Sequence, residues 1–237
     1  MHYRRPGMVT MGPRLTPALK YIILTCVGVY FLSALGAREE MIYFFGLAPL
    51  SVFTKLFIWQ PFTYLFFHDG FWHIFMNMFV LWMFGSEMER YLGSREFVRF
   101  FFITGAGAGL ISILVHPMSG IPTIGASGSV YGVLLAYAML FPERIVYLYF
   151  LFPVKVKYFI SLLFVVAFLS ALGSSGDSID HVAHLGGGLF AYLYLKGFLS
   201  WKKVREHYNR WRLQRLRRKF KVYENERRKR DDDFWIN

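Results

Sequence analysis

A serine between two glycines is the first group in this sequence whose type and setting could support chemistry. Gly125 and Gly128 flank the Ala126–Ser127 pair and remove side chains on both sides of the serine hydroxyl. If a helix starts at this point, its unpaired backbone N–H groups would stabilise negative charge that develops on a nearby oxygen. The same glycines also fit close packing of membrane helices, because Gly128 and Gly132 are four residues apart. Ser127 is therefore a candidate nucleophile, and both interpretations of the glycines can hold together.

His184 is the candidate base for this serine, because a serine hydroxyl is a weak nucleophile until a base takes its proton. Gly187 follows three residues later and shares a helical face with His184. A helix with this face could pack against the glycines around Ser127 and bring the imidazole to the hydroxyl. A single histidine in an apolar segment can also be a buried polar residue with a structural role. No acid clearly completes a triad, since Asp180 would reach His184 only along a continuous helix, but a Ser–His pair is chemically workable.

Three further side chains could support the same chemistry. Tyr131 lies one helical turn after Ser127, where its ring could stack on the ring of His184. His73 and Asn77 are four residues apart, so they share one face of a helix, and both can donate hydrogen bonds. Together with the backbone amide of Ser127 they could form an oxyanion hole, in which each donor is typically worth about 10²–10³ in rate.

The histidines also allow a metal site as an alternative. The possible ligand sets are His68, His73 and Asn77, or His73 with His181 and His184. The sequence contains no H-E-x-x-H motif and no cysteine near these histidines, which counts against a metal. We therefore expect neither a metal nor another cofactor.

Long apolar runs are the elements that must position these residues. The chain of 237 residues is 55% hydrophobic and 18% charged, against about 45–50% and about 25% in soluble domains. A run of about 18–20 apolar residues can cross a bilayer as a helix. Such runs cover residues 18–35, 62–84, 97–115, 125–141, 157–172 and 181–199. The first run is longer than the core of a signal peptide, so we expect it to be an uncleaved helix. We predict an all-α, polytopic membrane protein with six transmembrane helices.

The positions of Lys and Arg predict the orientation of this bundle. The formal net charge of +12 is concentrated before the first run, in two connections and after the last run, and cytoplasmic loops are the basic ones. Both termini are therefore expected in the cytoplasm, with residues 1–17 and 201–237 flanking a membrane domain over residues 18–200. The tail is either an amphipathic helix on anionic lipid or a solvated basic segment, and we do not expect it to bind nucleic acid. The apolar and aromatic segment 36–61 is expected to lie in the membrane interface.

The order of these motifs along the apolar runs gives the sequence a family resemblance. The segments GASG at Ser127, AHLGG at His184 and H-x-x-x-N from His73 to Asn77 resemble those of the rhomboid intramembrane proteases. The resemblance implies a six-helix bundle with an interfacial loop between helices 1 and 2. It implies that Ser127 is the nucleophile, His184 the base, and His73 and Asn77 the oxyanion donors, with Tyr131 beside the catalytic histidine.

The resemblance extends to further residues and to the activity. It implies a structural acid at Glu89 and a polar position at His68, while Gln60 and Ala191 depart from residues that are common in the family. It implies a serine endopeptidase that cleaves transmembrane helices near the extracytoplasmic face. We expect a bacterial inner membrane, with an organelle membrane as the alternative. The alternative is a non-catalytic membrane scaffold that binds transmembrane helices and would tolerate loss of the serine or the histidine. A transporter would be expected to show internal repeats, and none is evident.

Overall fold

The computed structural model describes residues 14–148, 152–173, 181–201, 208–210 and 213. The chain up to Leu193 forms one compact unit, and the chain from Tyr194 onwards forms a second. Most of the basic tail falls outside the described residues, as do residues 1–13. The predicted contact of the tail with anionic lipid therefore stays a prediction.

Glu89 fixes the start of the first helix, α1 (Pro17–Ala34). Its carboxylate accepts hydrogen bonds from the backbone N–H groups of Ala18, at 3.0 Å, and Leu19, at 2.8 Å, and from the hydroxyl of Ser94, at 2.5 Å. The first N–H groups of a helix have no partner inside the helix, and the positive end of the helix dipole attracts a carboxylate. The structural role expected for Glu89 agrees with this geometry.

The interfacial segment after α1 is more ordered than a loop. It contains two short helices, α2 (Arg38–Phe45) and α3 (Pro49–Lys55). Gln60 ties the segment to the bundle, because its side-chain oxygen accepts a hydrogen bond from the backbone N–H of Ala48 at 3.1 Å. Large aromatic side chains of α2 stay exposed, Phe44 for example at 47%, as suits a segment lying against lipid.

The second predicted helix starts eight residues later than the sequence analysis placed it. Residues 60–69 form a short helix, a 3₁₀ turn and a connection. The chain breaks before the long helix because Asp69 has extended backbone angles and Gly70, where α5 begins, has a φ of +82°, which glycine adopts easily. The long helix then runs to Leu92 with a π-helical turn in its middle. Its parts are α5 (Gly70–Val80), the turn Leu81–Gly85 and α6 (Ser86–Leu92), and they are preceded by α4 (Gln60–Thr63) and the 3₁₀ turn Tyr64–Phe66.

Three helices in the described part of the chain are long and apolar enough to cross a membrane. They are α1, α7 (Ser94–Val115) and α9 (Val156–Gly173). The apolar helix α8 (Ser127–Leu140) has only 14 residues, and a further helix runs over residues 181–193 in the first unit. The number of six spans therefore stays a prediction, whereas the mainly helical membrane fold is confirmed.

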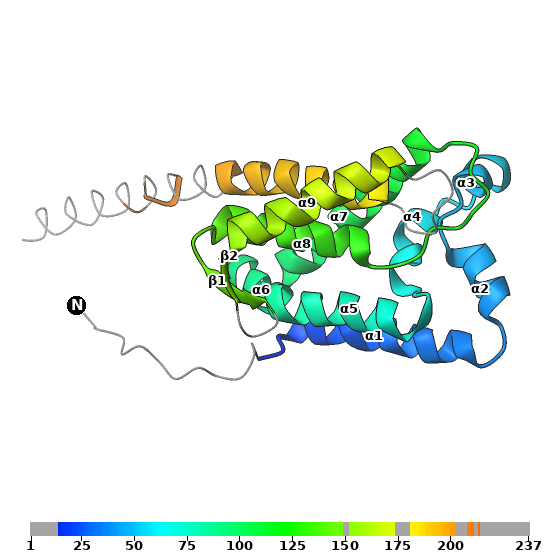
Figure 1. Ribbon diagram of the computed structural model, residues 1–237, viewed down its shortest axis with the longest axis horizontal. Coiled ribbons are helices and arrows are strands. Elements are labelled where there is room, and N and C mark those ends of the chain that lie inside the picture. Colours follow the sequence, from blue (N-terminus) through cyan, green and yellow to red (C-terminus); the bar gives the residue numbers. More distant parts are fainter. Residues whose placement is uncertain (1–13, 149–151, 174–180, 202–207, 211–212, 214–237) are drawn as a thin grey trace, which may run out of the picture. The chain divides into compact units, whose positions relative to one another are not determined.

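The helices that carry the candidate site pack around α8. Figure 1 shows α1, α5, α8 and α9 side by side, and each contacts the next. α8 also packs on α7, where the hydroxyl of Ser129 donates to the carbonyl of Phe101 at 2.7 Å. A Cβ atom added to Gly132 would lie 2.8 Å from the Cβ of Thr104. Small residues thus let α8 approach α7 closely, as is typical of membrane helices.

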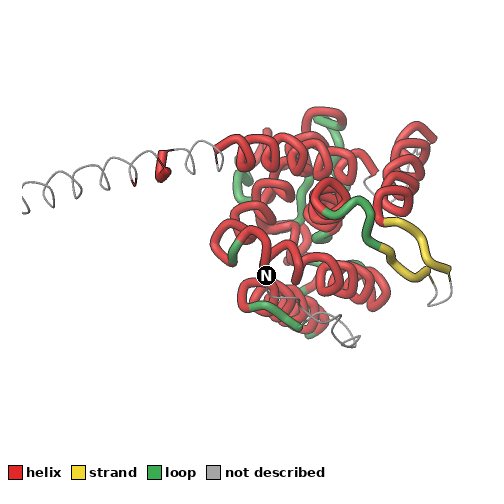
Figure 2. Tube along the Cα trace, turned by 90° about the vertical axis from the view of Figure 1, so that its left-hand side faces the viewer, coloured by secondary structure: helices red, strands yellow, loops and turns green. Residues whose placement is uncertain are grey.

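The connection between α8 and α9 is a β-hairpin that the sequence analysis did not predict. Its strands, β1 (Ile145–Leu148) and β2 (Phe152–Lys155), pair antiparallel and project at one side of the view in Figure 2. The carboxylate of Glu143 accepts hydrogen bonds from the ammonium groups of Lys155, at 2.7 Å, and Lys157, at 2.5 Å. These hydrogen bonds lower the pKa of the Glu143 carboxyl to about 2, so this exposed cluster stays ionised at neutral pH.

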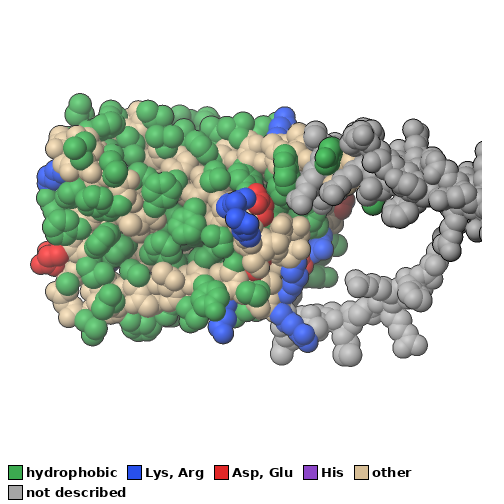
Figure 3. Space-filling view, turned by 180° about the vertical axis from the view of Figure 1, so that it is seen from behind, with side chains coloured by type: hydrophobic (Ala, Val, Ile, Leu, Met, Phe, Trp, Pro, Cys, Tyr) green, Lys and Arg blue, Asp and Glu red, His purple; other side chains and the backbone are tan. Residues whose placement is uncertain are grey.

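The surface of the first unit is suited to lipid. Hydrophobic side chains cover much of the face seen in Figure 3, and most of the Lys and Arg side chains in that view lie in its right-hand half. On α9 alone, Leu162, Leu169 and Leu172 are 59–71% exposed. Soluble monomers rarely expose continuous apolar surfaces of this kind. The first unit is therefore a membrane domain.

Candidate active site

Ser127 and His184 meet across two helices. Ser127 is the first residue of α8, and His184 lies in the helix over residues 181–193. The distance between Ser127 Oγ and His184 Nε2 is 2.8 Å, within the range in which an imidazole can take a proton from a hydroxyl. The imidazole is 8% exposed, so it lies at the edge of the packed interior. The predicted pairing of these two side chains agrees with this geometry.

A backbone-to-backbone contact between the two helices sets the distance between Ser127 and His184. A Cβ atom added to Gly187 would lie 2.0 Å from the carbonyl oxygen of Gly128, so the two helices touch backbone to backbone. Gly187 is one turn after His184, and Gly128 follows Ser127 directly. The predicted packing of one glycine face on the other therefore holds for Gly128. It does not extend to Gly132, which faces α7.

Tyr131 supports the imidazole from one side. Its ring stacks on the ring of His184 with a centroid distance of 4.3 Å and an interplanar angle of 5°. The ring of Phe164, from α9, lies edge-on against Tyr131 at 5.4 Å. The stack limits rotation of the imidazole and keeps its Nε2 directed at Ser127.

The chain just before Ser127 has a strained turn that only glycine adopts easily. Gly125 has a φ of +126°, and its N–H donates to the carbonyl of Tyr64 at 3.0 Å. The next N–H, that of Ala126, points to Nε2 of His68 at 3.4 Å. The carbonyl of Phe66 lies 3.3 Å from the other ring nitrogen of His68 and fits as its acceptor. His68, which the sequence marked as a polar position and as a possible metal ligand, therefore holds the turn that presents Ser127.

His73 faces the same turn with a hydrogen-bond donor. A Cβ atom on Gly125 would lie 2.7 Å from Nε2 of His73, so the ring edge lies directly beside the turn. The backbone N–H of Asp69 donates to Nδ1 of His73 at 3.1 Å. A neutral imidazole that accepts at one nitrogen carries its proton on the other. Nε2 of His73 is therefore an N–H donor pointing at the segment that carries Ser127.

Asn77 lies one turn further along α5 and is nearly buried, with 7% of its surface exposed. Its amide nitrogen donates to the carbonyl of His73 at 2.8 Å. This bond uses one of the two amide hydrogens and leaves a second one for another acceptor. The structure thus places Asn77 on the correct helix next to His73, but its only hydrogen bond shown among the described residues is to the backbone of its own helix.

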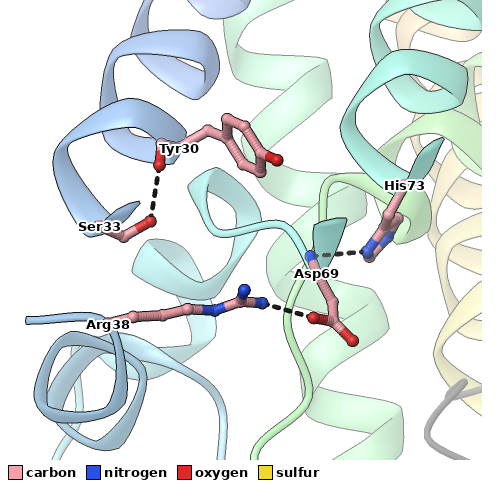
Figure 4. Close-up of polar contacts among 5 residues, drawn as sticks. All are labelled: Tyr30, Ser33, Arg38, Asp69 and His73. Carbon is pink, nitrogen blue, oxygen red and sulfur yellow. Dashed lines mark hydrogen bonds and ion pairs between the residues drawn. The ribbon is translucent and has the colours of Figure 1, made fainter. Parts of the chain in front are cut away.

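An ion pair links the His73 segment to the corner after α1, as Figure 4 shows. The guanidinium of Arg38, at the start of α2, pairs with the carboxylate of Asp69. The backbone N–H of the same Asp69 donates to the ring of His73. Nearby, the hydroxyl of Ser33 donates to the carbonyl of Tyr30 at 2.8 Å and closes the end of α1. No pattern in the sequence indicated that Arg38 and Asp69 meet, because their contact depends on how the intervening segment with α3 and α4 folds back.

The same histidines do not gather as a metal-binding group. Among the residues that the structure describes, no three His, Cys, Asp or Glu side chains lie close enough together to hold a metal ion. His68 and His73 lie edge to face at a centroid distance of 5.1 Å, and His181 and His184 do so at 5.8 Å. His68, His73 and His184 also take part in the hydrogen bonds described above.

Comparison with known proteins assigns this membrane domain to a family. Residues 55–201, more than half of the chain, match the family model described as the Rhomboid domain. The chain belongs to the rhomboid family. The matched residues include Ser127, His184, His73, Asn77 and Tyr131. Membership agrees with the apolar helices, and the chain is an integral membrane protein.

Curated rhomboid relatives match over part of their length. The mitochondrial Rhomboid protein 1 of Saccharomyces cerevisiae is 34% identical over 132 residues, which are 54% of this chain and 38% of the yeast protein. Rhomboid protease GlpG of Salmonella paratyphi A and that of Salmonella typhi are each 32% identical over 146 residues, 61% of this chain and 51% of theirs. The chain thus matches about half or less of each relative's length. Since these relatives come from a mitochondrion and from bacteria, the bacterial inner membrane stays a prediction.

Proposed function

We propose that this rhomboid is an intramembrane serine endopeptidase that uses Ser127 as nucleophile and His184 as general base. The observation that carries the proposal is the 2.8 Å contact between Ser127 Oγ and His184 Nε2. The positions of Gly187 and Tyr131 support it, because both hold the imidazole in this place. The similarity to proteins named rhomboid proteases supports the reaction class.

The first half of the reaction forms an acyl-enzyme. His184 Nε2 takes the hydroxyl proton as Ser127 Oγ attacks the carbonyl carbon of the substrate peptide bond. The carbonyl oxygen becomes an oxyanion, which the Nε2–H of His73, the backbone N–H of Ser127 and the second amide hydrogen of Asn77 are available to bind. The imidazolium then gives its proton to the leaving amine, and the C–N bond breaks.

The second half of the reaction regenerates the serine. A water molecule gives a proton to His184 and attacks the ester carbonyl, and the proton returns to Ser127 Oγ when the ester bond breaks. Water is needed at the site, which fits its position at the N-terminal end of α8 next to the loop over residues 116–126.

The substrate that fits this site is a peptide segment at one end of a transmembrane helix. The basic residues Arg90, Arg99 and Arg144 lie at the other ends of the helices that lead to the site, and basic ends are cytoplasmic. Ser127 is therefore expected near the extracytoplasmic face. A peptide bond inside a helix is closed off by its own backbone, so the substrate must unwind locally before attack.

Cleavage in proteoliposomes tests this function. Full-length wild-type protein and the variants Ser127→Ala, His184→Ala and His181→Ala would be incubated with several single-pass substrates. His181 is a matched control because it is a histidine on the same helix, one turn away, whose ring touches His184 edge-on but forms no hydrogen bond with Ser127 among the described residues. We expect the wild type and the His181 variant to cleave, and the other two to lose at least about 10³-fold in rate. A folded wild type that cuts none of the substrates, or equal cleavage by all four proteins, would contradict the proposal; the first result would favour the scaffold function.

A further inference from the structure

An apolar groove of about 470 Å³ runs along the outside of the membrane domain between α1 and α7. Tyr21, Ile22 and other side chains of α1 form one wall, and Val98 and Phe102 of α7 form the other. The α1 wall extends from Pro17 to residue 25, about 12 Å along the helix. This length is close to the ~15 Å hydrocarbon thickness of one leaflet.

Arg95 stands at the end of this groove where both helices begin. It is exposed, and it forms no ion pair with any residue in the described part of the chain. Its neighbour one turn along, Arg99, does not line the groove and pairs with Glu96 at 3.2 Å. An unpaired guanidinium cannot lie in hydrocarbon without a large cost, so Arg95 must sit at the level of the lipid headgroups.

We propose that this groove is a binding site for one anionic phospholipid. An acyl chain would lie along Tyr21, Ile22, Val98 and Phe102, and the guanidinium of Arg95 would bind the phosphodiester. The occupant needs an apolar part of about one leaflet in length and a negative charge at the interface. A phospholipid such as phosphatidylglycerol has both, with the charge at the end of the apolar chains where Arg95 lies. Guanidinium binds phosphate oxygens in a planar, two-bonded geometry, which favours Arg over Lys at such a site. The site lies at the opposite end of α1 from the Arg38 corner and does not depend on the proposed proteolysis.

Native mass spectrometry of the full-length protein tests the site. Protein would be released from micelles containing equal amounts of phosphatidylglycerol and phosphatidylcholine, and the fraction that retains each lipid would be measured. We expect the wild type and Ser127→Ala to retain phosphatidylglycerol preferentially. Arg95→Gln should weaken the apparent Kd for phosphatidylglycerol about fivefold, the effect of one interfacial charge. The matched control Arg99→Gln should leave it unchanged.

Two further measurements distinguish the contribution of the acyl chain to binding from that of the headgroup. Thr25→Trp, at an exposed position lining the groove, should reduce retention of both lipids by filling the space for the chain. Water-soluble glycerophosphate should not displace phosphatidylglycerol. Equal effects of Arg95→Gln and Arg99→Gln, or unchanged retention in a folded Thr25→Trp protein, would overturn the proposal. Displacement by glycerophosphate, or a dimer of this chain that forms through the groove and is lost in Thr25→Trp, would also overturn it.

Discussion

Replacing Gly187 by alanine should separate the two helices that hold Ser127 and His184. The added Cβ would lie 2.0 Å from the carbonyl oxygen of Gly128, and that oxygen belongs to the backbone and cannot rotate away. An ordinary contact of at least 3.4 Å requires the helices to move apart by about 1.4 Å. The Oγ–Nε2 distance, now 2.8 Å, would then exceed the range of a hydrogen bond.

Gly187→Ala should reduce the rate of cleavage strongly and the stability of the protein moderately. A misplacement of about 1 Å can reduce a catalysed rate about 10²-fold, so Gly187→Ala should lose about that much in kcat. Crowding in a well-packed interior typically costs about 1–3 kcal/mol of unfolding free energy. Cleavage of a single-pass substrate in proteoliposomes would measure the first effect, and thermal unfolding in detergent would measure the second.

Two glycine variants serve as controls for this prediction. A Cβ on Gly188 would meet the ring of Phe164 at 2.3 Å and the side chain of Leu135 at 3.6 Å. Both are side chains and can shift more easily than a backbone carbonyl, so Gly188→Ala should be milder than Gly187→Ala, although Phe164 also contacts Tyr131. A Cβ on Gly28 in α1 meets nothing within 4 Å, and alanine there should keep activity and gain up to about 1 kcal/mol in helix propensity. A Gly187→Ala protein with wild-type cleavage and wild-type melting would show that the Gly187–Gly128 contact does not set the distance between Ser127 and His184.

Substitutions at three other positions test parts of the site and its support. Gly125→Ala forces a side chain into a φ of +126° and against His73, so kcat in the cleavage assay should fall about 10²-fold; a rate within twofold of wild type would contradict this. Tyr131→Phe should keep the stacked ring and most of the activity, whereas Tyr131→Ala should lose up to about tenfold, because such a ring contact is worth about 0.5–1.5 kcal/mol; equal rates of the two variants would argue against the stack. Glu89→Gln removes the charge that caps α1 and should lower the unfolding free energy by about 1–3 kcal/mol, measured by denaturation in detergent; an unchanged value would show that the amide caps equally well.

The pairing of Ser127 with His184 could be anticipated because small residues leave few ways to pack two helices. Gly128 and Gly187 have no side chains, so the sequence allowed a close approach of the two helices where they lie, which could bring the polar groups beside them together. The position of Tyr131 beside His184 was expected from the helical repeat, because Tyr131 lies one turn after Ser127. These inferences needed only the order of the residues and the period of a helix.

Other features depend on how distant segments return to each other. The start of α5 at Gly70 was missed because the apolar residues before His68 were joined to those after Gly70 as one run, and composition alone does not show that the helix breaks at Asp69 and Gly70. The role of His68 in holding Ala126, and the ion pair of Arg38 with Asp69, require the fold itself. The β-hairpin after α8 carries no strong alternation of polar and apolar residues, and it was therefore read only as a basic connection.

Activation of Ser127 by His184 can be tested by covalent labelling. Full-length protein in liposomes would be treated with a fluorophosphonate, digested and sequenced by mass spectrometry, alongside the His184→Ala and His181→Ala variants. We expect one modified residue, Ser127, in the wild type and in the His181 variant, and almost no label in the His184 variant. Label on another residue, or equal labelling of Ser127 without His184, would contradict it.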